Sequence, residues 1–587
     1  MTVTDSADTH LEVEIKLDAE AGFRLPDLRV LPDVSSIENG QVQELEAVYL
    51  DSADLRLVRH GTTFRRRTGG GDAGWHLKLP AARAGRIEVR QELGRSVRAV
   101  PPQLLGLIRV QLRGAEVAPV ARIATHRTVY RLLGAAGVVL AEVADDRVRA
   151  EAMGAELTTT SWREIEVELV DGDPALLEAA AAVLVGAGAR PSDVGSKLSR
   201  ALGRRLASLR LAESGPAVAG ADDQEAGAGG EAGKAGGVGP AGKAGKTAKA
   251  GKTAKAGKGV KSSAGHRSRA RRVKPAVPSA GAAVVDYLGL HLAALIAEDP
   301  QVRLEAEDSI HQMRVETRRL RAALATFRPL FAEGVVEPLR EELKWLGGVL
   351  GVARDAEVMR GRLTREIGAQ PVELVLGPVQ RRVDLELGAA YREGYAGVIE
   401  ALDGDRYLAL VIALEDFVAA PPLTGAAAGA ASVQLRSRVR AACRRVAKAA
   451  AVLDAADPAR AVSDQDHPLH AVRKAAKRAR YAAEAAGPVA GKKAKKLAKA
   501  MEEIQETLGN HQDAVVEQVW LRDLGVRAFL NQENGFTFGR LHGLSEVRAQ
   551  HDEEAFADVW RSARTVVAAW PGLKKTPGQI TVSSGWR

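Results

Sequence analysis

The sequence predicts a multidomain α+β protein with an N-terminal antiparallel β-barrel, a disordered Lys/Gly/Ala-rich linker and a C-terminal all-α domain. Charged and apolar residues alternate in the first third of the chain, Gly, Ala and Lys dominate a middle segment, and long Ala/Leu/Arg/Glu segments with few Gly or Pro follow. The 587 residues exceed the roughly 250–300 that one core serves. We place the barrel at 1–205, the linker at 206–280, the helical domain at 281–575 and a tail at 576–587.

The basic charge of the chain is concentrated in the linker. Lys and Arg number 83 against 74 Asp and Glu, which gives a net charge of +9. Residues 232–274 hold nine Lys and four Arg without an acid, so the rest of the chain carries −4. Lysine recurs at every third position from Lys243 to Lys261 among residues that cannot form a core. This pattern indicates either a flexible, soluble tether or a polyanion-binding tail with salt-sensitive, sequence-blind phosphate contacts.

Composition excludes several classes of protein. Hydrophobic residues make up 46% and aromatic residues 4%, so Ala, Val and Leu must build the cores. The single cysteine, Cys443, excludes an internal disulfide and a multi-cysteine zinc site. No apolar run approaches the roughly 20 residues of a membrane span, and the first ten residues lack the features of a secretory signal. We therefore expect a cytoplasmic protein with no membrane association.

The N-terminal domain has strands with one charged face. Strict alternation over residues 11–17 places Glu12, Glu14 and Lys16 on the same face, with apolar residues opposite. Glu166 and Glu168 repeat the pattern near the end of this domain. Further strand candidates with charge at alternate positions are 64–67, 75–78, 86–90 and 125–127.

The distribution of charge among these strands favours a closed barrel. Carboxylates are grouped on the first and last strands and cations on the middle ones. A single charged face is usually solvated, but this segregation is needed only where the charges line a lumen. Neighbouring carboxylates offer hard oxygen ligands for Mg²⁺ or Mn²⁺, which also take phosphate oxygens, and opposing Arg and Lys would hold other phosphate oxygens. A metal-bound polyphosphate is the implied ligand.

The motif Glu12-x-Glu14-x-Lys16 resembles the signature of the CYTH domain of the triphosphate tunnel metalloenzymes. That family folds as an eight-stranded antiparallel barrel whose tunnel binds triphosphate compounds and divalent metal. The resemblance implies that Glu12, Glu14 and Lys16 are catalytic, and Lys16 is a candidate proton acceptor. It implies metal ligands at Glu12, Glu14, Glu166, Glu168 and Asp145, with Asp146 as the alternative to Asp145. It implies triphosphate-binding residues at Lys16, Arg65, Arg67, Lys78, Arg86, Arg127, Lys197 and Arg200.

The C-terminal domain contains an internal repeat. The sequence His311-x-x-Arg314-x-x-x-Arg318-Arg319-x-Arg321 recurs 159 residues later as His470-x-x-Arg473-x-x-x-Lys477-Arg478-x-Arg480. Leu350-Gly351 with Asp355 likewise recurs as Leu508-Gly509 with Asp513. A helix turns by roughly 100° per residue, so each helix presents one His and three cations in a stripe. One such stripe is usually a solvated face, but its duplication favours a cationic groove neutralised by an anion.

This pattern resembles the CHAD domain, a conserved-histidine α-helical domain of two four-helix bundles that binds polyphosphate. The implied polyphosphate-binding residues are His311, Arg314, Arg318, Arg319, Arg321, His470, Arg473, Lys477, Arg478 and Arg480. We assign the histidines no catalytic role.

Together these features predict a divalent-metal-dependent triphosphatase. The barrel would hydrolyse inorganic triphosphate or short polyphosphate with Mg²⁺ or Mn²⁺, while the helical domain holds long polyphosphate nearby. Two alternatives remain open: a non-catalytic polyphosphate-binding protein associated with polyphosphate granules, and a nucleic-acid binder acting through the Lys-rich linker.

Overall fold

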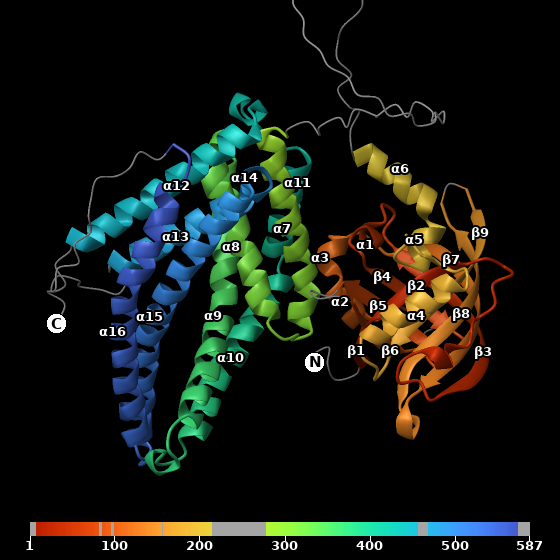
Figure 1. Ribbon diagram of the computed structural model, residues 1–587, viewed down its shortest axis with the longest axis horizontal. Helices are drawn as coiled ribbons and strands as arrows, with labels where there is room; N and C mark the ends of the chain where they lie inside the picture. The colour runs from red at the N-terminus through yellow and green to blue at the C-terminus, as the bar shows by residue number, and fades with distance from the viewer. Residues whose placement is uncertain are drawn as a thin grey trace, which may run out of the picture. The chain divides into compact units, whose positions relative to one another are not determined.

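The computed structural model describes residues 8–80, 85–94, 99–154, 156–213, 278–455 and 468–572, which form a barrel domain and a helical domain (Figure 1). Helix α6 (Gly203–Glu213) continues past the boundary predicted at residue 205, and helix α7 (Ala280–Arg303) begins at the predicted end of the linker. Most of the linker and the whole tail lie outside the described residues. Disorder and polyanion binding in the linker therefore stay predictions.

The barrel domain is built on an antiparallel sheet. Its strands are β1 (Asp8–Glu12), β2 (Glu14–Ala19), β3 (Ser36–Asp51), β4 (Thr63–Thr68), β5 (Gly74–Pro80), β6 (Arg86–Glu92), β7 (Ala118–Leu133), β8 (Val139–Ala152), β9 (Thr158–Leu169) and β10 (Arg190–Pro191). They pair in the order β1-β6-β5-β4-β3-β7-β8-β9-β2-β10.

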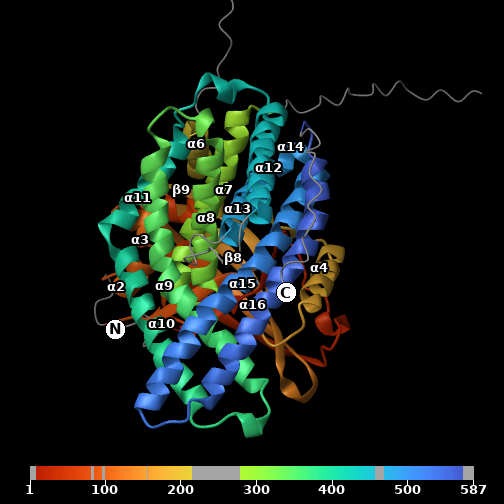
Figure 2. The same ribbon diagram turned by 90° about the vertical axis from the view of Figure 1, so that its left-hand side faces the viewer.

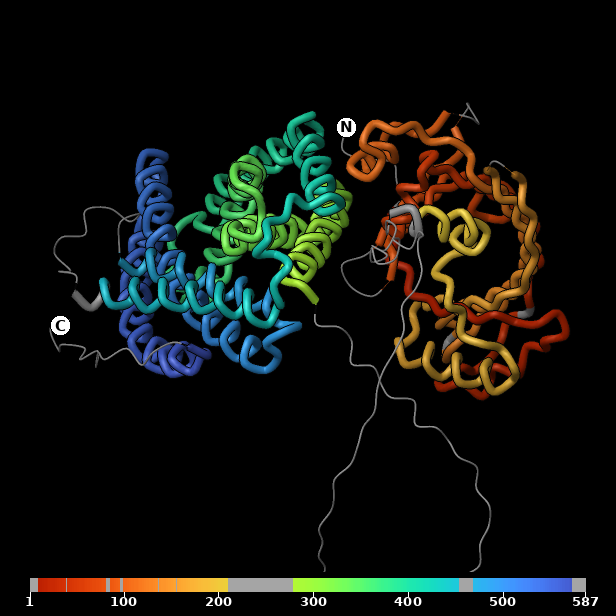
Figure 3. The backbone as a smooth tube through the Cα atoms, turned by 90° about the horizontal axis from the view of Figure 1, so that it is seen from above, coloured from red at the N-terminus to blue at the C-terminus, as the bar shows by residue number. Residues whose placement is uncertain are grey.

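The first strand closes this sheet into a barrel. β1 and β2 are two halves of one strand that is interrupted at Val13. One half pairs with β6 and the other with β9, so the ends of the sheet meet and the sheet closes into a ring (Figure 3). The two-residue strand β10 pairs with β2 at this seam. The predicted barrel is confirmed, and the strand predicted over 11–17 is divided between β6 and β9.

Short helices cover or fill this barrel. They are α1 (Arg56–Arg59), α2 (Pro102–Leu107), α3 (Arg109–Leu112), α4 (Ala175–Gly186), α5 (Lys197–Ala201) and α6. α4 packs Leu177 and Leu184 against the apolar outer face of β2, β8 and β9. α5 and α6 lie differently, because Leu198 and Leu206 pack with Tyr49 and Ile123, which point into the lumen. These two helices therefore plug the lumen from one side (Figure 3).

The helical domain consists of two successive antiparallel units, as the repeat predicts. Its helices are α7, α8 (Ser309–Phe327), α9 (Val336–Gly368), α10 (Val379–Asp403), α11 (Asp405–Ala419), α12 (Ala431–Ala455), α13 (Pro468–Ala485), α14 (Gly487–Ala490), α15 (Lys492–Leu530) and α16 (Phe536–Ala568). α7–α11 form the first unit and α12–α16 the second (Figure 2). Buried Leu, Val and Ala side chains from both units form one continuous core.

The two units also join at the far ends of their long helices. Leu363 of α9 and Val383 of α10 share a second buried cluster with Leu521 of α15 and Leu541 of α16. The backbone N–H of Leu376, which precedes α10, donates to Thr537 Oγ1 in the first turn of α16 at 2.8 Å. The green and blue turns meet at this tip in Figures 1 and 2.

Helix α7 is long and apolar enough to cross a membrane by length and composition alone, which contradicts the expectation from the sequence that no apolar segment approaches a membrane span. Its Val284, Leu288 and Leu295 instead lie in the shared core of the helical domain. Its last turns bury Asp299 and Arg303, which form an ion pair of 2.8 Å. α7 has the contacts of a core helix in a folded domain.

A glycine sets a close contact between two helices of the first unit. A Cβ atom at Gly394 of α10 would lie 2.8 Å from the backbone N of Ala353 and 2.9 Å from its Cα on α9. Real Cβ atoms do not approach backbone so closely, so the two helices can pack this way only with glycine at position 394.

We expect Gly394→Ala to destabilise the helical domain by about 1–3 kcal/mol, since α10 must move away from α9. Gly397→Ala is the matched control on the same helix, because its Cβ would meet no atom within 4 Å. That control should stabilise the protein by about 0.5–1 kcal/mol through helix propensity. Urea unfolding followed by circular dichroism would measure both, and equal stability of the two variants would contradict the packing argument.

Candidate functional site

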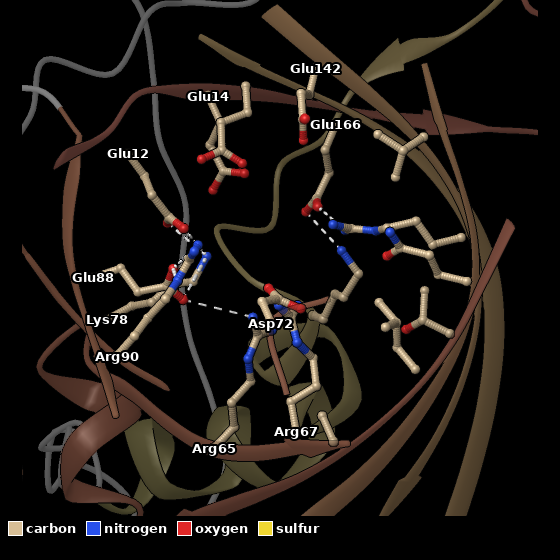
Figure 4. A pocket seen from close by; sticks show the side chains of 18 of the residues that line it. Glu12, Glu14, Arg65, Arg67, Asp72, Lys78, Glu88, Arg90, Glu142 and Glu166 are labelled. Carbon is tan, nitrogen blue, oxygen red and sulfur yellow. Dashed lines mark hydrogen bonds and ion pairs between the residues drawn. The ribbon is translucent and has the colours of Figure 1, made fainter. Parts of the chain in front are cut away.

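The barrel encloses a cavity of about 470 Å³ whose lining is mostly charged (Figure 4). The acids that line it are Glu12, Glu14, Glu38, Asp72, Glu88, Glu142, Glu166 and Glu168. The bases that line it are Lys16, Arg65, Arg67, Lys78, Arg86, Arg90, Arg127, Arg131 and Lys197. Alternate residues of every strand face inward, so the predicted charged faces converge on one space.

A row of carboxylates crosses three neighbouring strands. Register pairs Glu14 of β2 with Glu168 of β9, and Glu168 with Glu142 of β8, so the three side chains lie side by side. Burial, and then the charges of Glu12 and Glu14, raise the pKa of Glu168 to about 7. Crowded carboxylates of this kind are the donor set that a hard divalent cation requires. Glu142 was not among the predicted ligands.

A second cluster of charges surrounds Glu166. Its carboxylate accepts from Arg127 at 2.7 Å, lies 2.8 Å from Lys197 Nζ and also contacts Lys16 Nζ. Burial opposes ionisation of Glu166, but Lys16, Lys197 and Arg127 outweigh it and hold its pKa well below the usual range. Burial likewise opposes the charge on Lys16, yet Glu166 and Glu14 raise its pKa. The raised pKa favours the protonated form of Lys16, and its role as a proton acceptor stays a prediction.

A third cluster surrounds Glu88, whose side chain is fully buried. Arg90 Nε donates to it at 2.6 Å, His76 Nδ1 lies at 3.0 Å and Lys78 Nζ at 3.7 Å. Burial opposes its charge, but the hydrogen bond from His76 and the charge of Lys78 lower its pKa. Lys78 also donates to Glu12 at 2.6 Å. Glu88 thus fixes the cations on one wall of the tunnel.

Two predicted barrel residues do not reach the cavity. Asp145 faces outward and accepts from Arg163 at 2.7 and 2.8 Å, so it is wrong as a metal ligand. The adjacent Asp146 faces inward, accepts from Arg127 at 2.8 Å and lies 2.9 Å from Lys197. One residue of register decides between these neighbours, because successive side chains point to opposite faces of a strand.

Arg200 is the second predicted barrel residue that does not line the cavity. It lies on α5, where it contacts Asp18, lies 3.6 Å from Glu164 and stacks on Trp162 at 5.3 Å. It does not line the cavity, so its role is to hold the plugging helix against the barrel. Arg86 does line the cavity, and it donates to the carbonyl of Gly195 at 3.0 Å.

The acids of the cavity fit a divalent metal. Within the part of the chain that the structure describes, two groups offer ligand atoms within 4.8 Å of one another: His10 with Glu12 and Glu88, and Asp146 with Glu164 and Glu166. Both groups are already paired with Lys or Arg. In the row of Glu14, Glu168 and Glu142, Glu14 pairs with Lys16 at 2.8 Å and Glu142 pairs with Arg131 at 2.9 Å. Burial and the charges of Glu12 and Glu14 raise the pKa of Glu168, so Glu168 is the carboxylate of this row at which a bound cation would relieve most repulsion.

The helical domain builds its cationic stripe on repeated contacts between helices. Arg314 of α8 donates to Asp355 of α9 at 2.7 Å. A Cβ at Gly351 would lie 3.4 Å from the Arg314 guanidinium, and one at Gly509 would lie 3.5 Å from that of Arg473. The repeated Leu-Gly pair therefore marks the place at which each arginine lies against the next helix, at a distance that would be ordinary van der Waals contact for a Cβ.

α8 and α13 bring their stripes together into one cationic cluster. Burial, and then the charges of Arg473, Arg318 and Arg314, lower the pKa of Lys477 to about 7. The buried Nε atoms of Arg318 and Arg473 have no hydrogen-bond partner in the described structure. Like charges packed with free donors stabilise a bound anion.

Two of the predicted polyphosphate-binding residues are paired with acids. Arg319 pairs with Glu316 at 2.7 Å and Glu484 at 3.5 Å. Arg480 pairs with Glu484 and Glu502, each at 2.8 Å. Glu484 comes from the helix that carries Arg480, and no spacing rule within α8 could show that it also reaches Arg319. These two arginines are therefore neutralised.

Comparison with known proteins agrees with this division of the chain. The CYTH domain model matches residues 10–186, and the CHAD domain model matches residues 286–522. Uncharacterized protein Rv2226 of Mycobacterium tuberculosis strain H37Rv is 35% identical over 546 residues, covering 91% of this chain and 92% of that protein. Uncharacterized protein MT2285 of strain CDC 1551 matches over the same length at the same identity.

Solved structures match one domain at a time. PptA from Streptomyces chartreusis is 22% identical with a TM-score of 0.40, covering 48% of this chain and 99% of that one. The CHAD domain from the plant Ricinus communis is 25% identical with a TM-score of 0.39, covering 50% and 93%. The family assignment rests on the two domain models and on the full-length relatives.

We expect Glu166→Gln and Glu168→Gln to change stability in opposite directions at pH 8. Glu166→Gln removes the negative charge that Lys16, Arg127 and Lys197 share, so it should lower the free energy of unfolding by about 3 kcal/mol. Glu168 has a folded pKa of about 7 against 4.5 for the free side chain, so its contribution to stability falls as pH rises through this window. Glu168→Gln should therefore raise the melting temperature at pH 8 and leave it nearly unchanged at pH 4.5.

Thermal unfolding in EDTA at the two pH values would measure these effects without metal. A loss of stability in both variants at pH 8 would contradict the distinction between the paired and the crowded carboxylate.

Proposed function

Because this chain belongs to the family of two-domain proteins in which a CYTH domain precedes a CHAD domain, we propose that its barrel is a divalent-metal-dependent triphosphatase and its helical domain a polyphosphate-binding module. The barrel would act on inorganic triphosphate or short polyphosphate. The observation that carries this proposal is the cavity itself, in which buried cations face a row of crowded carboxylates.

The cations of the tunnel suit a phosphate chain. Hydrolysis of a phosphoanhydride passes through a loose transition state, with charge spread over the transferred oxygens. Arg65, Lys78, Arg127 and Lys197 are already held by buried carboxylates, so they need little reorganisation when substrate binds. Lys16, whose raised pKa favours the protonated form, adds a positive charge between the cations and the carboxylate row.

The carboxylate row supplies the metal site in this proposal. Glu14, Glu168 and Glu142 would hold Mg²⁺ or Mn²⁺, with Glu12 nearby. The bound metal supplies positive charge to phosphate oxygens and lowers the pKa of a coordinated water. The chain itself keeps the phosphate oxygens oriented through the guanidinium groups of Arg65 and Arg127, which can donate in parallel pairs.

The helical domain supports a role in holding substrate. Its cluster of Arg314, Arg318, Arg473 and Lys477 lacks enough acids for neutralisation, and a linear polyanion can supply the missing charge along the groove. Joined to the barrel in one chain, such a module raises the local concentration of phosphate chains without new contacts at the barrel.

Glu14→Gln should lower release of phosphate from tripolyphosphate by on the order of 100-fold, because a ligand of the metal loses its charge. Purified full-length protein would be assayed with Mg²⁺ and with Mn²⁺. Glu151→Gln is the matched control, because Glu151 lies on the outward-facing side of β8. This variant should keep full activity.

A wild-type protein that releases no phosphate, while wild type and Glu14→Gln bind long polyphosphate equally, would overturn the enzymatic proposal. The chain would then be a polyphosphate-binding protein.

Binding of long polyphosphate should be tighter at pH 6 than at pH 8. Lys477 has a pKa of about 7, so it gains its proton below that value and adds one charge to the cluster. Lys477→Arg, which imitates Arg318 of the first repeat, should keep that charge at both pH values and reduce the difference by about threefold to tenfold. Fluorescence anisotropy with labelled polyphosphate would measure it.

The exposed Lys474→Arg is the control for this substitution and should behave as wild type. An unchanged pH dependence in Lys477→Arg would exclude Lys477 as its source.

A further inference from the structure

The turn between β4 and β5 folds into the mouth of the barrel cavity. Gly69 and Gly70 have φ of +83° and +72°, which glycine adopts without strain. A Cβ at Gly69 would lie 2.0 Å from the carbonyl O of Glu44 on β3. The turn is therefore pressed against β3, and Gly71 and Asp72 at its tip line the cavity.

Asp72 is held in the cavity by two contacts. Its carbonyl O lies 2.9 Å from His76 Nε2, and His76 in turn lies 3.0 Å from the buried Glu88. Its carboxylate forms an ion pair with Arg67. Figure 4 shows Asp72 directed toward the ends of Arg65 and Arg67 inside the tunnel.

Arg67 differs from the other buried cations of the tunnel in the origin of its partner. Lys16, Lys78, Arg65 and Arg127 pair with carboxylates on barrel strands, which the hydrogen-bond ladder fixes. The partner of Arg67 comes from a turn. The Arg67 side chain is 7% exposed and that of Asp72 is 34% exposed, so the acid is the member that can swing away.

Arg67 also requires an anion more than its neighbours do. Burial, and then repulsion by Arg65 and Arg127, lower its pKa to about 9. Its buried Nε has no hydrogen-bond partner within the described residues. An anion with several acceptor oxygens would satisfy this guanidinium better than one carboxylate does.

We propose that Asp72 is an internal anion that occupies the phosphate subsite of Arg67 in the empty tunnel and yields it to a phosphate group of the substrate. This inference rests on the proposed binding of triphosphate in the barrel. Asp72 thereby acts as an intramolecular competitor that keeps Arg67 charged and in place before binding. Because only the molecules in which Asp72 has left the subsite can bind phosphate there, the apparent affinity for the substrate is reduced in proportion to their fraction.

Asp72→Asn keeps the shape of the side chain and removes its charge. This substitution should tighten binding of tripolyphosphate by about tenfold. That value applies if Asp72 occupies the subsite in roughly nine molecules of ten, so that only about one in ten is ready to bind. Isothermal titration of the full chain in EDTA would measure this without turnover. Every arm would carry Arg473→Gln and Lys477→Gln, so that binding by the helical domain is weakened equally.

Two further variants separate competition from a structural role. Asp72→Glu retains the carboxylate and should bind within about twofold of the protein that keeps Asp72. In an Arg67→Gln background, Asp72→Asn should produce no gain, because the subsite for which the two anions compete is lost. Melting temperatures would establish that each variant is folded.

The outcomes distinguish this inference from the proposed activity. Unchanged or weaker binding by Asp72→Asn, or a gain that persists without Arg67, would overturn the inference. A tenfold gain in a protein that releases no phosphate with Mg²⁺ or Mn²⁺ would support the inference and overturn the enzymatic proposal. Failure to bind tripolyphosphate in EDTA, both with Asp72 in place and in the Asp72→Asn variant, would overturn the inference, and failure to bind it with Mg²⁺ or Mn²⁺ as well would also overturn the enzymatic proposal.

Discussion

Mutual neutralisation of charges inside the closed barrel is the interaction on which the rest of this structure depends. Glu88 and Glu166 are buried, and each is surrounded by several cations. Either carboxylate alone would be costly to bury, and so would the cations without it. Together they hold the basic side chains at fixed positions before any ligand arrives. The same network ties Lys197 of the plugging helix to the strands. The ion pairs that hold this helix in the lumen therefore also position a cation of the cavity.

The helical domain treats charge in the opposite way. Its two repeats bring Arg318 and Lys477 together without enough acids to neutralise them, and burial of these cations lowers their pKa values. The hydrophobic core that joins both repeats offsets the free energy that repulsion between these buried cations costs. In the barrel, acids and bases neutralise each other and the ligand must exchange with internal partners. In the helical domain, the ligand itself completes the neutralisation, which suits a long polyanion of variable length.

Much of the candidate site could be predicted because the period of a strand is a local property. Alternation alone places Glu12, Glu14 and Lys16 on one face and Glu166 with Glu168 on another, and all five line the cavity. The prediction failed where two neighbouring residues were of the same type, as for Asp145 and Asp146. It also failed where the side chain binds a partner outside the cavity, as for Arg200. Glu142 was passed over for the same reason: its importance comes from lying beside Glu168 on the neighbouring strand.

The sequence by itself determined the two domains, which follow from changes of composition along the chain. It also determined the charged faces of the strands and the repeated stripe of the helices, which follow from spacing along one element. Tertiary structure decided which of these charges are free. Strand register turned Asp146 inward, packing of α8 against α13 neutralised Arg319 through Glu484, and a glycine turn carried Asp72 to Arg67. The physical reason is that Coulomb energy depends on distance and burial, and both arise only when segments far apart in the chain are packed together.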